Sequence, residues 1–148
     1  MGQYLIVYMV DPVKVGQRFT LWPLHVTLLP WFEAPDGKAV EACVRVATNS
    51  TRPCSVSTTE RGYYGLKGNL PVMKLEITSQ LQTLHKTLLS AVEEQGWEVK
   101  GRYIGNNYTP HITQKAGRGF EGELNIDTIH IAEAQSQGYR QIIAEVKL

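Results

Sequence analysis

Cysteine is scarce in this chain of 148 residues, and long apolar runs are absent. Only Cys43 and Cys54 occur, without the spacing of a metal site or a disulfide framework, so we interpret both as reduced thiols. No run approaches the roughly 20 apolar residues that a membrane-spanning helix needs. The N-terminal residues also lack the basic segment and the small-residue cleavage site of a secretory signal. These absences lead us to expect a cytoplasmic protein without membrane association.

A strong charge of either sign is missing as well. The chain has 15 Lys and Arg against 14 Asp and Glu, which leaves a formal net charge of +1. This balance gives no broad positive field, and that argues against long duplex nucleic acid as a partner. A small anionic ligand stays compatible with it, because such a ligand needs only a local positive pocket.

The remaining composition, 43% hydrophobic and 20% charged, is that of an ordinary globular domain. We expect residues 1–148 to form one domain, because the length suits a single core and no linker or low-complexity tract interrupts it. Apolar, β-rich runs at 4–10 and 24–32 predict two buried strands. Pro30 is expected to interrupt the second strand near its end.

Two helices are predicted. Asp36 is placed to cap a helix over 37–49, where apolar residues recur at helical spacing. Ser79 and Gln82 form a capping-box pattern ahead of a second helix, which should stop at Gly96. The apolar face of this second helix comprises Leu81, Leu84, Leu88 and Val92.

The rest of the chain has strand and turn patterns. About seven strands and two helices indicate an α+β fold with a largely antiparallel sheet. Besides the two strands above, we expect extended structure at 54–60, a glycine-rich loop at 61–71, an alternating strand at 71–78, a strand at 108–115, and a closing hairpin of 124–132 and 141–148 that turns at Gln137-Gly138.

Two short segments share one pattern, in which a proline shortly precedes a histidine, a β-branched residue and a threonine. They are Pro23-Leu24-His25-Val26-Thr27 and Thr109-Pro110-His111-Ile112-Thr113. Residues two apart along a strand point to the same face, so each histidine shares a face with its threonine. The residue between them then points into a core. The sequence therefore places an imidazole beside a hydroxyl twice.

Two such pairs suit phosphoester cleavage. A neutral imidazole takes a proton from the attacking water or hydroxyl, and a protonated imidazole gives one to the leaving oxygen. Free histidine has a pKa near 6.5, so both forms are accessible. Each positioned proton transfer increases the reaction rate by about a hundred- to ten-thousand-fold. The threonine hydroxyls can bind the non-bridging phosphate oxygens, and no step needs a metal or cofactor.

The histidines have other interpretations. A single His-x-Thr in a strand is common, and zinc binding is the sharper alternative. Neither motif has a nearby cysteine or a metal-site spacing, and the nearest carboxylate is Glu33, so we predict no metal site. His85 is interpreted as a partly buried helix residue, and His130, between two isoleucines, as a structural sheet residue.

At these motifs the sequence resembles the two-histidine (2H) phosphoesterase superfamily, in its bacterial 2′–5′ RNA ligase and RNA 2′,3′-cyclic phosphodiesterase branch. The likeness rests on 25–32 and 108–113, and the strand and helix of 71–89 fall where the family has them. It implies a bilobal α+β fold in which two small, mostly antiparallel sheets, each backed by a helix, flank a cleft. Gln114 departs from the family, which usually has an apolar residue there.

The resemblance also implies a function. The implied function is that of a cofactor-free phosphodiesterase that acts on 2′,3′-cyclic or 2′–5′ phosphodiesters of nucleotides or short RNA ends. By position His25, Thr27, His111 and Thr113 take the catalytic and phosphate-holding roles. The reverse reaction, carried out by the same residues, would join RNA ends, and this is a second hypothesis. A third is a cleft that binds RNA without cleaving it. Two intact motifs favour an enzyme, which we expect to be a monomer.

Substrate contacts are harder to assign. Lys115 shares a face with Thr113 and is a candidate for binding phosphate. Tyr108 and Tyr139 are candidates for stacking on a base. Trp31 is a candidate for the same role, although packing between lobes is the alternative. The charged residues of the glycine-rich loop, Arg61 and Lys67, are interpreted as a clamp or as plain surface.

Overall fold

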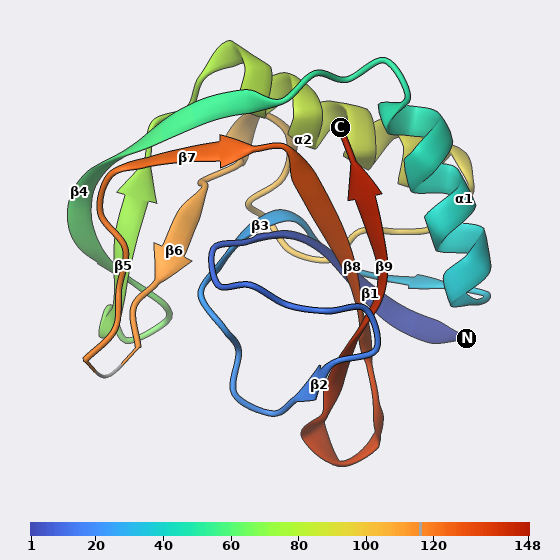
Figure 1. Cartoon of the computed structure of the whole chain (residues 1–148), viewed down its shortest axis with the longest axis horizontal. Helices are drawn as coiled ribbons and strands as arrows, with labels where there is room; N and C mark the ends of the chain where they lie inside the picture. The colour runs from blue at the N-terminus through green and yellow to red at the C-terminus, as the bar shows by residue number, and fades with distance from the viewer. Residues whose placement is uncertain (116) are drawn as a thin grey trace.

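Across residues 1–115 and 117–148, which the computed structural model describes, nine strands join in one antiparallel sheet on which two α-helices pack (Figure 1). This confirms the α+β class and the antiparallel sheet. The strands are β1 (Gly2–Met9), β2 (Arg18–Phe19), β3 (His25–Ala34), β4 (Cys54–Tyr64), β5 (Leu70–Leu75), β6 (His111–Thr113), β7 (Glu123–Ile126), β8 (Thr128–Ala134) and β9 (Arg140–Lys147). The helices are α1 (Gly37–Thr48) and α2 (Ser79–Glu94), with short 3₁₀ turns η1 (Gly105–Asn107) and η2 (Ser136–Gly138).

The sheet has two halves that meet at the strands carrying the motifs. Its order is β2-β9-β8-β1-β3-β6-β5-β4-β7. One residue pair, Val26 with Ile112, joins β3 to β6. The two sheets expected from the resemblance are therefore joined into one, because the two motif strands hydrogen-bond to each other. Each half still has its own helix, since α1 contacts β9 and β3 while α2 contacts β3 and β4.

Both predicted helices are present, and their caps explain where they begin. The side chain of Asp36 accepts a hydrogen bond from the amide of Ala39, at 2.8 Å, as predicted for α1. For α2 the cap is Thr78, whose hydroxyl accepts from the amide of Leu81 at 3.1 Å. The predicted capping box at Ser79 was thus one residue late, because Ser79 already has helical backbone.

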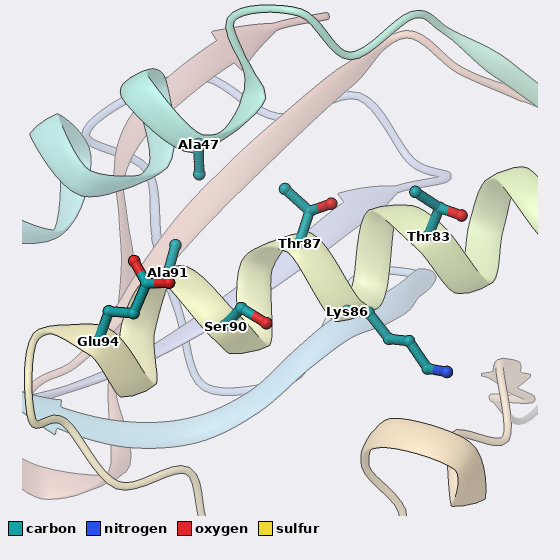
Figure 2. Close-up of a pocket in the computed structure, with 7 residues that line it drawn as sticks. All are labelled: Ala47, Thr83, Lys86, Thr87, Ser90, Ala91 and Glu94. Atoms are coloured by element: carbon teal, nitrogen blue, oxygen red, sulfur yellow. The ribbon is translucent and has the colours of Figure 1, made fainter.

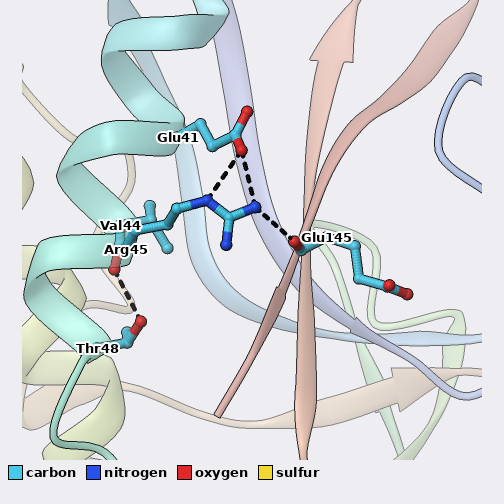
Figure 3. Close-up of polar contacts among 5 residues, drawn as sticks. All are labelled: Glu41, Val44, Arg45, Thr48 and Glu145. Carbon is cyan, nitrogen blue, oxygen red and sulfur yellow. Dashed lines mark hydrogen bonds and ion pairs between the residues drawn. The ribbon is translucent and has the colours of Figure 1, made fainter.

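Helix α1 is held to the sheet by polar contacts as well as by its apolar face (Figure 3). The guanidinium of Arg45 donates to the Glu41 carboxylate, one turn earlier, at 2.9 Å. It also donates to the backbone carbonyl of Glu145 on β9, at 3.1 Å. Figure 3 shows the Glu145 carboxylate pointing away from Arg45, so only its carbonyl serves this contact.

Strand β3 is longer than predicted, because Pro30 lies at an irregularity that the strand absorbs. The β1–β3 register shifts twice, once on each side of the pair between Ile6 and Leu29. Such bulges put consecutive residues on one face of the sheet. Leu28 and Leu29 are both fully buried in the main core, while Pro30 and Trp31 are half-buried outside it. The predicted interruption at Pro30 was therefore wrong.

Three more strand predictions need correction. The predicted glycine-rich loop at 61–71 is largely a hairpin, because β4 continues to Tyr64 and β5 begins at Leu70. The strand predicted over 108–115 is shorter, since only His111–Thr113 is a strand. The run 124–132 is divided at Asp127 into β7, which pairs with β4, and β8, which pairs with β1 and β9 (Figure 1). The closing hairpin of β8 and β9 is present.

The main core lies between the helices and the sheet and includes the predicted apolar face of α2. A smaller apolar cluster lies on the opposite face of the sheet, in the half that contains β1, β8 and β9. It includes Leu5, Val7 and Met9 of β1. Among the helices in the described residues, none has the length and apolarity needed to cross a bilayer.

Candidate active site

The two motifs lie opposite each other across the β3–β6 pair. The pairing is antiparallel and centres on Val26 and Ile112, the middle residues of the motifs. Each histidine is therefore opposite the threonine of the other motif. The middle residues are fully buried in the main core. The four outer side chains, which point to the other face and are partly exposed, are those of His25, Thr27, His111 and Thr113.

The two imidazoles are held in the same way. Nδ1 of His25 lies 2.9 Å from the carbonyl oxygen of Pro23, and Nδ1 of His111 lies 2.8 Å from that of Thr109. A carbonyl oxygen only accepts, so Nδ1 donates its proton in both cases. This bond fixes the tautomer, and in each neutral ring Nε2 is the nitrogen left to exchange a proton with a ligand.

Burial lowers the pKa of both histidines below the usual value of 6.5. The hydrogen bonds to the two carbonyls oppose this effect without cancelling it. The positive charges of Lys115 and of protonated His111 lower the pKa of His25 further. Both rings are therefore neutral at pH 7 in the unliganded protein. Lys115 itself forms a bridge with Arg118 and is not among the described residues that line the cleft beside the motifs.

An aromatic ring backs each histidine. The centroid of the Trp22 ring is 4.5 Å from that of His25. The ring of Tyr64 meets His111 edge-on, with centroids 4.9 Å apart. These contacts restrict the motion of the imidazoles and keep water from one side of each ring.

A cleft of about 690 Å³ opens beside the motifs and reaches Thr27 and His111. One wall comes from the end of the β4–β5 hairpin, with Tyr63 and Tyr64. Arg102 and Tyr103, from the segment between α2 and β6, also line it. These four residues were not predicted from the sequence, because a pair of adjacent tyrosines and an Arg-Tyr dipeptide have no pattern until the chain folds.

Lys74 is a further residue near the site that was not predicted. It pairs with His111 across β5 and β6, and its ammonium lies 5.7 Å from the centroid of the Tyr64 ring. Its ammonium is also 3.6 Å from the Glu60 carboxylate. Its neighbour Met73 is buried, as expected for alternate residues of a strand that face opposite sides of the sheet.

Tyr108 does line the cleft, but it has a different role from the stacking one expected. It is 4% exposed, so its ring is not free to stack on a base. Its hydroxyl donates to the carbonyl oxygen of Thr27 at 2.8 Å, and burial raises its pKa. Tyr108 therefore holds the backbone of the first motif.

Trp31 and Tyr139 are not among the described residues that line the cleft. Trp31 packs against the smaller apolar cluster, with the guanidinium of Arg140 5.6 Å from its ring centroid. Tyr139 lies next to β9, where the guanidinium of Arg18 is 4.6 Å from its ring centroid. The packing alternative for Trp31 agrees with this placement, and the structure does not bring Tyr139 to the motifs.

His85 is fully buried, deeper than predicted. Its Nε2 accepts a hydrogen bond from the amide of Gly105 at 2.8 Å, so Nε2 carries no proton. Nδ1 then donates to the carbonyl oxygen of Leu28 at 2.7 Å. Burial lowers its pKa, which keeps it neutral. The other structural histidine, His130, is nearly buried, with Nε2 3.2 Å from the Glu145 carboxylate.

A second hollow lies away from the motifs. A hollow of about 470 Å³ lies on the helical side, along α2 and beside Ala47 of α1 (Figure 2). It is lined by small or hydroxyl side chains together with Lys86 and Glu94, which Figure 2 shows well apart. Within residues 1–115 and 117–148 no group of three or more His, Cys, Asp or Glu side chains could hold a metal ion.

Comparisons with known proteins agree with this fold. The family model of the 2′-5′ RNA ligase superfamily matches residues 11–118. No curated protein matches the chain. E. coli LigT in complex with 3′-AMP is similar in structure, with a TM-score of 0.65, 13% identity and coverage of 99% of this chain and 98% of that one.

Two further solved structures share the fold. TT0787 of Thermus thermophilus has a TM-score of 0.61 and 19% identity, with coverage of 100% of this chain and 98% of that one. A crystal structure described as a phosphoesterase has a TM-score of 0.64 and 14% identity, with coverage of 99% and 98%. The fold of this chain thus extends over nearly the whole length of these proteins.

Proposed function

The chain belongs to the 2′-5′ RNA ligase superfamily, and we propose that it is a metal-independent phosphodiesterase that hydrolyses 2′,3′-cyclic or 2′–5′ phosphodiesters of nucleotides or RNA ends. Membership confirms the resemblance to two-histidine phosphoesterases and supports a phosphoesterase activity. The observation that carries the proposal is the placement of two imidazoles, each with Nδ1 bound to a carbonyl and Nε2 left for proton transfer.

In the proposed mechanism the phosphate lies over the β3–β6 pair. Nε2 of one histidine takes a proton from water as the oxygen of that water attacks phosphorus. Nε2 of the other, protonated histidine gives its proton to the bridging oxygen as the P–O bond to it breaks. Thr27 and Thr113 donate hydrogen bonds to the non-bridging oxygens, on which charge accumulates.

Binding of the substrate favours protonation of one of the two histidines. Burial keeps both imidazoles neutral in the empty site, so one of them must gain a proton when substrate binds. A phosphate anion within a few ångströms favours the charged imidazole and raises its pKa. The Lys115 charge disfavours a proton on His25, while also being suited to hold the phosphate.

A nucleotide substrate is supported by the ligands crystallised with E. coli LigT, namely 3′-AMP, ATP and NADP⁺. Ligation of RNA ends is the reverse reaction at the same residues, and product analysis separates the two directions. A binding module without turnover would leave the four polar side chains without a chemical purpose. We keep the cytoplasmic location, the monomeric state and the single domain as parts of this proposal.

Turnover of a panel of 2′,3′-cyclic mononucleotides and 2′–5′ dinucleotides, with chelator present, tests the proposal. We expect His25→Ala and His111→Ala each to lose at least about a hundred-fold in kcat, the smaller end of a positioned proton transfer. His130→Gln is the control, since that histidine lies on β8, two strands away from β3, with its Nε2 beside the Glu145 carboxylate. Wild-type turnover in either alanine variant, or full loss of turnover on chelation, would contradict the mechanism.

A further inference from the structure

The cleft is asymmetric about the catalytic residues. Of the four, only Thr27 and His111 are among the described residues that line it. From there it extends along the end of the β4–β5 hairpin and the segment at 102–103. A substrate whose phosphate lies over the motifs therefore has a shaped cavity for one of its two sides, on the side of His111.

The far part of this cleft has exposed aromatic rings. Tyr63 is 68% exposed and Tyr103 is 59% exposed, although both are large and partly apolar. They are 40 positions apart and come from different elements, yet line the same cavity. Leu66, at the tip of the hairpin, adds a fully exposed apolar side chain to the same lining. Apolar surface gathered in one cavity is typical of a ligand site.

The polar groups of this region suit a flat, polar ligand. The exposed Arg102 precedes Tyr103, and among the described residues it forms no ion pair. A guanidinium can stack on a base or bind an oxygen of the ligand. Tyrosine faces stack on any nucleobase, and their hydroxyls can bind its edge.

We propose that this cleft is the nucleoside-binding arm of the active site, with Tyr63 and Tyr103 as the residues that make the enzyme select phosphodiesters bearing a base. The inference rests on the proposed function, since it assumes that the phosphate is bound at the two motifs. The base lies against the two tyrosine rings, and the ribose spans the distance to Thr27 and His111. The volume of about 690 Å³ leaves room for a nucleoside and adjoining groups.

The test compares two substrates that share the reacting bond. One is a 2′,3′-cyclic nucleotide, and the other is the 2,3-cyclic phosphate of 1-O-methylribose, which lacks the base. We expect wild-type kcat/KM to favour the nucleotide by roughly 5- to 150-fold, as one or two stacked rings provide. Tyr103→Ala and Tyr63→Ala should lose most of this preference, because kcat/KM falls much more for the nucleotide than for the base-free substrate.

Two variants separate stacking from other effects. Tyr103→Phe keeps the ring and should keep most of the preference, whereas Tyr139→Ala removes a tyrosine outside the cleft and should change nothing. A wild-type enzyme without preference, or a preference retained when both tyrosines are alanine, would overturn the inference. If neither substrate turns over, the proposed function fails instead, and calorimetry with 3′-AMP against 1-O-methylribose 3-phosphate still decides whether the two tyrosines select the base.

Discussion

The imidazole of His85 lies flat against the ring of Tyr108, with centroids 4.0 Å apart and an interplanar angle of 5°. Each ring also binds β3, Tyr108 through the carbonyl of Thr27 and His85 through that of Leu28. Tyr108 lies just ahead of the second motif, so one buried unit holds both motifs in place. We therefore expect His85, a helix histidine outside the cleft, to contribute to the geometry of the site.

Tyr108→Phe should keep the stacked ring and lose its hydrogen bond to Thr27. We expect a loss of about 0.5–1.5 kcal/mol in the free energy of unfolding, because the carbonyl of Thr27 loses a buried partner. We also expect lower kcat, since the backbone of the first motif is less well fixed. Urea unfolding and steady-state kinetics measure both effects, with Tyr139→Phe as control. Unchanged turnover would show that the backbone at Thr27 is fixed without this bond.

His85→Phe should destabilise the fold strongly. The amide of Gly105 and the carbonyl of Leu28 would lose their partners, and a buried unpaired group costs about 1–3 kcal/mol. Urea unfolding beside Ser90→Ala, an exposed change on the same helix, measures the difference. Equal midpoints for the two variants would mean that water reaches and satisfies the two backbone groups.

Stability should fall as the solution is acidified below pH 6.5. Burial lowers the pKa of all four histidines in the folded state, so the unfolded chain binds more protons in this range. The free energy of unfolding then rises with pH, up to the unfolded pKa near 6.5, and is lost as pH falls toward the folded values. Denaturation midpoints at pH 7.5, 6.0 and 5.0 should decrease in that order, and the opposite order would refute this assignment.

The pH dependence of kcat/KM should have its maximum on the acidic side of neutrality. The dependence of kcat/KM on pH reports the free enzyme, and both catalytic pKa values lie below 6.5 there. One histidine must be neutral and the other charged, so we expect the maximum of kcat/KM below pH 6.5. The maximum of kcat should lie higher, because bound phosphate raises the pKa of the protonated histidine. A kcat/KM maximum above pH 7 would contradict the lowered values.

Lys115→Met should move one limb of that profile to higher pH. The variant removes a positive charge that lowers the pKa of His25, so His25 becomes easier to protonate. KM should increase as well if the ammonium binds phosphate. Lys147→Met, at the exposed end of β9, is the matched control for loss of a lysine. A limb that does not move would place the Lys115 charge too far from His25 to matter.

Local patterns in the sequence were sufficient for the helices and the motifs. Asp36 caps α1 through its own side chain, and the leucine spacing of α2 depends only on neighbouring turns. Alternation along β3 and β6 likewise gave the shared face of each His-Thr pair. These features involve residues a few positions apart, which is why the sequence alone predicts them.

Features set by distant contacts were missed. The joining of the two halves depends on a pair between Val26 and Ile112, which no local pattern reveals. The break at Asp127 follows from the pairing of β7 with β4, whereas β8 pairs with β1. The cleft brings Tyr63 and Tyr103 together only after the hairpin forms. For the same reason exposed Tyr139 and buried Tyr108 looked alike in the sequence.

The position of β1 between β3 and β8 has a consequence for synthesis and folding. Residues 2–9 are synthesised well before Thr128–Ala134, which is one of their two hydrogen-bonding neighbours. One edge of β1 therefore stays open until β8 has been synthesised, and an open edge can pair with other chains. We expect slow folding, dominated by this late pairing of long sequence separation, and a tendency of truncated chains to aggregate.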